Sequence, residues 1–171
     1  MTARWIEEIP EFGKRLPENC LLDKGITGCG ATRLAITNDR STLIAAPTVN
    51  LIKNKMQAHP DLLGVYGGVT NQEIADYLKT HDCWKIMATY DAIPGVADVA
   101  GAEIYSKAFL LVDEYHRLLF DYSFRNHAIT GLLEQAPRFA SKTYLSATPI
   151  GQEFLLDELQ SIPQVKIIWP R

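Results

Sequence analysis

The sequence predicts an α/β fold in which a parallel sheet is flanked by helices in three layers. Short apolar runs alternate with helix-like stretches along almost the whole chain. Most of these runs are continuously apolar rather than alternating, which is typical of strands that are buried on both faces of a parallel sheet. Strand and helix in regular alternation indicate βαβ units. Glycine-rich or polar residues directly follow most of the runs, as expected where parallel strands end at a site.

The expected strands are the short apolar runs, and the expected helices are the longer stretches between them. The strand candidates are Asn19–Asp23, Thr42–Ala46, Leu62–Tyr66, Trp84–Ala88, Phe109–Val112 and Thr143–Ser146. The helix candidates include Val49–His59, Asn71–Leu78 and Phe124–Glu134. Pro94 and Gly95 predict a turn or a broken helix after Tyr90.

Length and composition predict one soluble domain. A chain of 171 residues can bury a substantial core but leaves little room for a second domain. Its formal net charge of -3 gives no general support for binding a polyanion, although a local basic stripe is compatible with it. The three cysteines lack metal-ligand or disulfide spacing, and no apolar run approaches membrane-spanning length. We therefore expect a cytoplasmic protein with no membrane partner.

In parallel α/β sheets, ligands bind in the crevice beyond the carboxyl ends of the strands. Five candidate strands are followed directly by glycine-rich, hydroxyl-bearing or acidic residues, and all of these residues would line one edge of the sheet. The segments are Lys24–Thr32, Pro47–Thr48, Thr89–Tyr90, Asp113–His116 and Ser146–Pro149. Their common placement is a stronger indication of a site than any one segment.

The first segment has the frame of a phosphate-binding loop: a glycine, four residues, a second glycine, then one residue followed by Thr32. Glycines let successive backbone N–H groups point into an anion-sized nest. Ala31 stands where the lysine of such loops belongs, and Lys24 and Arg33 flank the loop. The alternative is a glycine-rich turn that binds nothing. The candidate cofactor-binding residues are Gly25, Thr27, Gly28, Cys29, Gly30, Ala31, Thr32 and Arg33.

The second segment places two carboxylates, Asp113 and Glu114, directly after an apolar strand. In this pattern the first carboxylate holds Mg²⁺ and the second polarises an attacking water. Asp113 and Glu114 are the catalytic candidates, and Thr32 with Asp113 are the metal candidates. The alternative is a solvated helix start, where acidic residues are stabilised by the helix dipole.

Together the segments resemble motifs I, Ia, Ib/Ic, II and III of superfamily-two helicases of the DEAD/DEAH-like group. The matching residues are the glycine loop, Ala46-Pro47-Thr48, Ala88-Thr89-Tyr90, Asp113-Glu114-Tyr115-His116 and Ser146-Ala147-Thr148-Pro149. They occur in that family's order and span roughly Cys20 to Pro149. The resemblance implies that residues 1–171 form one RecA-like lobe that binds ATP and Mg²⁺.

The same resemblance implies further roles and partners. His116, Ser146 and Thr148 would couple the nucleotide state to nucleic-acid grip, and Pro47, Thr48, Thr89 and Tyr90 would lie near a DNA or RNA backbone. For Thr48 and Thr89 a helix cap is an equally good interpretation. The partners implied are a nucleic acid and a second RecA-like lobe of the same full-length chain, which we expect to be truncated here.

Two departures from the family pattern leave alternatives open. The loop lysine is missing, and no second lobe is present to supply an arginine, so we expect the isolated chain to hydrolyse ATP at background. The leading hypothesis is the first motor lobe of a helicase or translocase. The rivals are a catalytically lapsed helicase-like binding module and a related P-loop ATPase such as a viral packaging motor.

Overall fold

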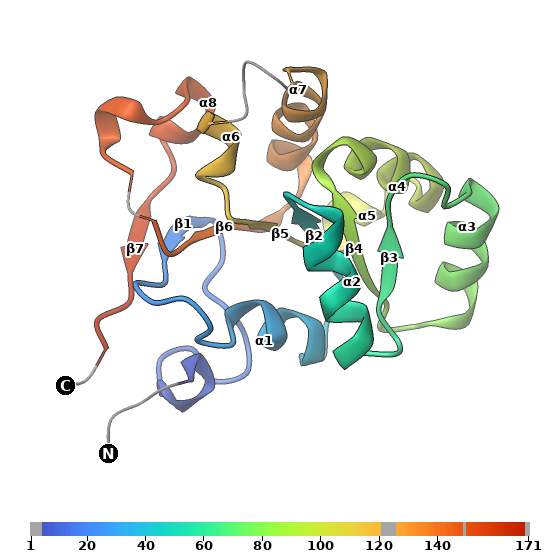
Figure 1. The fold of residues 1–171 in the computed structure, drawn as a ribbon, viewed down its shortest axis with the longest axis horizontal. Coiled ribbons are helices and arrows are strands. Elements are labelled where there is room, and N and C mark those ends of the chain that lie inside the picture. The colour runs from blue at the N-terminus through green and yellow to red at the C-terminus, as the bar shows by residue number, and fades with distance from the viewer. Residues whose placement is uncertain (1–4, 121–125, 149, 170–171) are drawn as a thin grey trace.

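An all-parallel sheet forms the middle of the molecule (Figure 1). The structure, a computed structural model, describes residues 5–120, 126–148 and 150–169. Within them the sheet has seven strands in the order β3-β4-β2-β5-β6-β1-β7. The strands are β1 (Cys20–Asp23), β2 (Thr42–Ala46), β3 (Leu63–Val65), β4 (Lys85–Thr89), β5 (Phe109–Asp113), β6 (Ser141–Ser146) and β7 (Gln164–Lys166).

The connections between the strands are mostly helical. The α-helices are α1 (Ala31–Thr37), α2 (Val49–Ala58), α3 (Asn71–Thr80), α4 (Ile93–Ala100), α5 (Ile104–Lys107), α6 (Arg117–Phe120), α7 (Asn126–Gln135) and α8 (Asp157–Gln160). Short 3₁₀ turns are η1 (Ile6–Glu8), η2 (Tyr90–Ala92), η3 (Ala136–Arg138) and η4 (Gln152–Phe154). Thr70 begins α3 with a capping box, because its hydroxyl accepts from the Glu73 N–H while the Glu73 carboxylate accepts from the Thr70 N–H.

Two apolar layers cover the two faces of the sheet. Along β2, Leu43 and Ala45 pack with the cores of α3, α4 and α7, whereas Ile44 and Ala46 pack with α1, α2 and η1 on the other face. This alternation within a continuously buried strand follows from the period of two residues along an extended backbone. The result is the three-layer α/β/α architecture that the sequence predicts.

The predicted α/β class is confirmed, and the predicted strands agree with the observed ones to within a few residues. The segment after Tyr90 differs from the prediction, since it is one 3₁₀ turn followed by the regular helix α4. Pro94 lies in the first turn of α4, where backbone N–H groups have no acceptor within the helix. The missing N–H of proline therefore costs no hydrogen bond, and Pro94 does not break the helix. β7 was not predicted; its short sequence, Gln164–Lys166, carries only one apolar residue.

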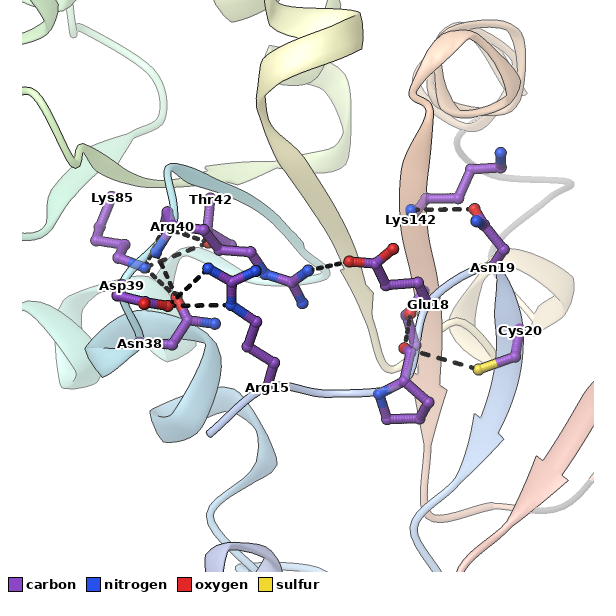
Figure 2. Close-up of polar contacts among 12 residues, drawn as sticks. Arg15, Glu18, Asn19, Cys20, Asn38, Asp39, Arg40, Thr42, Lys85 and Lys142 are labelled. Carbon is purple, nitrogen blue, oxygen red and sulfur yellow. Dashed lines mark hydrogen bonds and ion pairs between the residues drawn. The ribbon is translucent and has the colours of Figure 1, made fainter. Parts of the chain in front are cut away.

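Polar side chains gather at the amino edge of the sheet, around the starts of β1, β2 and β4 (Figure 2). The candidate motifs follow the opposite ends of the strands, at the carboxyl edge. The ammonium of Lys85 is buried at the start of β4 and donates to the carbonyl of Ala35, 3.1 Å away, and to the carbonyl of Arg40. It also donates to Oδ1 of Asn38, and the Thr42 hydroxyl lies 3.3 Å away. Lys85 therefore ties the carboxyl end of α1 to the start of β2 and β4.

None of the helices in the described part of the chain has the length and apolar character that spanning a bilayer requires.

Candidate functional site

The strand order brings the glycine loop and the Asp-Glu motif to the same edge. β5, β6 and β1 are neighbours, so the segments that follow them lie side by side. Two backbone hydrogen bonds attach the segments after β1 and β5 to the last residues of β6: Lys24 N–H donates to the Ser146 carbonyl at 2.9 Å, and Tyr115 N–H donates to the Leu145 carbonyl at 3.1 Å. The end of β6 thus lies between the other two segments.

The loop between β1 and α1 contains three glycines in the left-handed region of backbone conformation. Gly25, Gly28 and Gly30 have positive φ angles of 71°, 69° and 84°, and turns that alternate left- and right-handed residues form N–H nests. Among the described residues, no group accepts a hydrogen bond from the backbone N–H of residues 27–30. Residues 25–28 are exposed to solvent. The loop therefore offers several free N–H donors at the surface.

The amino-terminal turn η1 supports the far side of this loop. The Ile6 N–H donates to the carbonyl of Cys29 at 2.9 Å, and Ile6 is fully buried. Gly30 packs against the ring of Trp5, so that a Cβ atom at Gly30 would approach a ring carbon to 3.1 Å. With its φ of 84°, this close approach explains why glycine occupies position 30.

Thr32 and Asp113 are in direct contact although 81 residues separate them in the chain. The Thr32 hydroxyl donates to Oδ2 of Asp113 at 2.8 Å, and both side chains are buried. The second carboxylate oxygen, Oδ1 of Asp113, is buried and has no hydrogen-bond partner among the described residues. A buried carboxylate oxygen without a partner costs free energy, and such groups call for a functional explanation.

Glu114 adopts a backbone conformation that is rare for a residue with a side chain. Its φ is 51°, and non-glycine residues in this region are strained and concentrate at functional sites. The buried Tyr90 hydroxyl lies 2.6 Å from the carbonyl oxygen of Asp113 and 3.1 Å from that of Glu114. Tyr90 thereby fixes the peptide groups that turn the chain out of β5.

The three candidate coupling residues form one hydrogen-bonded chain. Nδ1 of His116 lies 2.7 Å from the Ser146 hydroxyl, which accepts from the Thr148 N–H at 2.9 Å. Burial lowers the pKa of His116, with Glu114 opposing that shift and the positive charges of Arg117 and Lys24 adding to it. In a neutral imidazole, Nδ1 either accepts the Ser146 hydroxyl proton or carries a proton and donates it to the Ser146 oxygen, depending on the tautomer. Pro149, the last residue of that motif, lies outside the described residues.

The two cations that flank the loop differ in their surroundings. Arg33 donates to the Glu7 carboxylate at 2.8 Å, and its guanidinium carbon lies 4.8 Å from the centre of the Trp5 ring. Lys24 is half-buried, and its ammonium has no hydrogen bond or ion pair among the described residues. Ala31, at the position of the missing lysine, is buried in the apolar layer below the loop.

The candidate nucleic-acid residues are buried, except for Thr48, which is half-buried. The Tyr90 ring is 1% exposed and Pro47 is buried, so these side chains support the edge from within instead of lying on its surface. Thr48 is half-buried and caps α2, since its hydroxyl accepts from the Leu51 N–H at 3.3 Å. Thr89 is buried at the end of β4 and has no side-chain cap bond to the turn that follows it.

The oxygen donors at this edge fit a magnesium ion. Mg²⁺ favours oxygen ligands and is usually held by one or two carboxylates together with substrate phosphates and water. The unpartnered Oδ1 of Asp113 and the hydroxyl of Thr32 are such ligands. No group of three or more His, Cys, Asp or Glu side chains converges within the described ranges, so phosphate oxygens and water would complete the shell.

Sequence reasoning missed several residues that shape the site. Trp5 and Trp169 flank the loop: Nε1 of Trp169 donates to the Lys24 carbonyl at 2.7 Å, and its ring lies beside Gly25. Between Gly25, Ala147 and the residues after β7 lies a hollow of about 480 Å³. No local sequence pattern identifies these tryptophans, because Trp5 lies near the start of the sequence and Trp169 near its end. We call the pair, which packs on both sides of the glycine loop, the tryptophan clamp.

The parallel sheet, its strand order and the glycine loop at its carboxyl edge define the RecA-like α/β fold of helicase domains. The chain is similar to the crystal structure of the Pyrococcus furiosus Hef helicase domain, with a TM-score of 0.57 and 17% sequence identity. The match covers 87% of this chain and 35% of that one, so this chain spans about a third of that structure. No protein-family model and no curated protein matches the sequence.

Proposed function

We propose that this domain is the first motor lobe of a nucleotide-dependent helicase or translocase, and that it binds ATP with Mg²⁺ at the carboxyl edge of its sheet. The observation that carries the proposal is the 2.8 Å contact between Thr32 and Asp113, beside the unpartnered Oδ1 of Asp113. If the glycine loop bound no ligand, nothing would explain why a buried carboxylate with one unpartnered oxygen contacts Thr32 at the start of α1. A nucleotide site with Mg²⁺ explains this arrangement.

Each group would have a distinct task. The free N–H groups of residues 27–30 would bind phosphate oxygens, and Thr32 with Asp113 would hold Mg²⁺. The ion supplies positive charge that offsets the phosphates. Glu114, whose strained backbone conformation follows directly after β5, would orient and polarise a water molecule. His116 and Ser146 would transmit the state of this site to the segment that contains Thr148.

The wider assembly belongs to the same proposal. A second RecA-like lobe of the full-length chain would close over the nucleotide and add the missing cationic side chain. DNA or RNA would lie across the ends of β2 and β4, where the backbone at Pro47, Thr48 and Thr89 can contact phosphates. With a net charge of -3, we expect nucleic-acid binding by this chain alone to be weak and to fall as salt rises.

Calorimetric titration with Mg-ATP tests the nucleotide site. We expect the parent chain to bind, and both Thr32→Ala and Asp113→Asn to weaken binding by about tenfold or more, because each removes an oxygen ligand or its charge. Asp91→Asn is the matched control, since Asp91 is exposed on the turn after β4. Hydrolysis should stay at background in every case. Absence of binding by the parent would rule out the proposal, and strong turnover that Glu114→Gln abolishes would contradict the expected inactivity.

One observation favours the second candidate, a catalytically lapsed binding module. Position 31 carries a buried alanine instead of a lysine, and the lysine normally neutralises the β and γ phosphates. If the loop binds no nucleotide while the domain still associates with nucleic acid, the helicase-like fold has kept its scaffold and lost its motor.

A further inference from the structure

A phosphate-binding loop needs positive charge close to the β and γ phosphates, and Ala31 cannot supply it. Backbone N–H groups bind phosphate oxygens but carry only partial charges. Another cationic side chain at the same edge would remove this deficit. Lys24 and Arg33 are the two cations closest to the loop in sequence.

Arg33 is already committed to other contacts. Its guanidinium pairs with Glu7 at 2.8 Å and lies over the Trp5 ring. Turning Arg33 toward the loop would break an ion pair and a cation–π contact, and would leave the Glu7 carboxylate unpaired. Arg33 also follows Thr32 by one position on α1, so its side chain leaves the helix about 100° away from the side chain that meets Asp113.

Lys24 is anchored at the carboxyl edge of the sheet by its backbone. Its backbone is fixed by three hydrogen bonds: its N–H donates to the Ser146 carbonyl, and its carbonyl accepts from the Ile26 N–H and from Nε1 of Trp169. Its ammonium has no hydrogen bond or ion pair within the described residues. Its backbone is bonded to the end of β6, and β6 lies next to β5, which leads into the Asp-Glu motif. Lys24 is therefore held at the edge where the glycine loop and the Asp-Glu motif meet.

We propose that Lys24, one residue before the loop, supplies the cation for the terminal phosphates of the nucleotide in place of residue 31. This inference rests on the proposed nucleotide site and adds a specific phosphate-binding residue to it. The rigid anchoring by Ser146 and Trp169 compensates for the unusual position, because it fixes the point from which the flexible lysine stem reaches over the loop.

The test is a titration of the purified chain with Mg-ATP, ADP and AMP. Lys24→Met should weaken Mg-ATP binding about tenfold, the usual value of one charge-assisted phosphate contact. The loss should be smaller for ADP and absent for AMP, because AMP lacks the terminal phosphates. Lys24→Arg should retain most of the affinity for ATP. Lys79→Met, at an exposed lysine of α3, is the matched control and should bind like the parent.

The outcomes separate this inference from the function on which it rests. If the parent binds Mg-ATP and Lys24→Met binds it equally well, Lys24 is not the cation and the nucleotide site stands. An equal loss for ATP and AMP would also overturn the assignment, because it would indicate a damaged loop and not a lost phosphate contact. If the parent binds no nucleotide, the proposed function fails, and this inference fails with it. Thermal unfolding of each variant shows whether the fold is intact.

Discussion

Two charged side chains are buried in the described part of the molecule, and they lie at opposite edges of the sheet. At the amino edge, the Lys85 ammonium is surrounded by four oxygen acceptors, from Ala35, Asn38, Arg40 and Thr42. At the carboxyl edge, the Asp113 carboxylate has one hydrogen-bond donor, Thr32, and one oxygen with no partner among the described residues. One charge is saturated and the other is left open.

This difference is the one we expect between a charge that stabilises the fold and a charge that binds a ligand. A buried charge that serves stability uses all of its hydrogen-bonding capacity, as the three donors of Lys85 do here. A buried charge that serves binding keeps capacity in reserve for a ligand, and the protein loses some stability in the ligand-free state. The comparison predicts that removing Lys85 harms folding, whereas removing the charge of Asp113 harms binding.

The largest expected effect is the loss of stability in Lys85→Met. Methionine keeps the apolar stem but leaves the carbonyl of Ala35 buried without the Lys85 donor, and it leaves the Thr42 hydroxyl as the remaining donor to the Arg40 carbonyl. A buried acceptor without a donor costs about 1–3 kcal/mol, so the free energy of unfolding should fall by about 2–3 kcal/mol. Urea denaturation measures this change. Lys79→Met, at an exposed position, should stay within about 0.5 kcal/mol of the parent. Equal stability of both variants would show that the saturated shell around Lys85 contributes nothing.

The buried ammonium of Lys85 should also make the free energy of unfolding depend on pH. Burial lowers the pKa of Lys85 to about 8 from the ordinary value of 10.5. The unfolded chain therefore binds more protons than the folded chain between these values, and stability attributable to this group rises with pH there. Relative to Lys85→Met, the parent should gain about 1–2 kcal/mol between pH 7 and pH 9.5. A pH-independent difference between the two would contradict the lowered pKa.

A smaller effect is expected when positive charge is added near the open carboxylate. Ala31→Lys should tighten Mg-ATP binding by roughly 1–2 kcal/mol, because it restores a charge-assisted contact to the phosphates. Ala31 is buried in the apolar layer, so a longer side chain has to displace its neighbours there, and the variant should also lose some stability. Calorimetry with the variant and the parent measures the gain in affinity. Unchanged affinity, with Thr32 and Asp113 intact, would indicate a loop that no longer holds phosphate.

Much of this edge could be predicted from the sequence because its elements are local. The glycine loop, the Asp-Glu pair and the strands before them each depend on contiguous residues, and parallel strands deliver their ends to one edge. The clamp formed by Trp5 and Trp169 and the shell of Lys85 could not be predicted, because they join residues far apart in the chain. Tyr90 shows the same limit: its motif predicted a surface role, while its burial and its hydroxyl contact with Asp113 depend on how β4 and β5 flank β2.

The smallest expected effect is the most informative for the comparison. Asp113→Asn removes the buried charge but keeps the size of the side chain and an acceptor for the Thr32 hydroxyl. Since that charge is only half satisfied, the free energy of unfolding should stay the same or rise by up to about 1 kcal/mol, even though Mg-ATP binding weakens by about tenfold or more. Asp91→Asn controls for the removal of a surface charge. A loss of more than about 2 kcal/mol in urea denaturation would mean that Asp113 is as structural as Lys85. The open oxygen at the carboxyl edge would then no longer be a sign of binding.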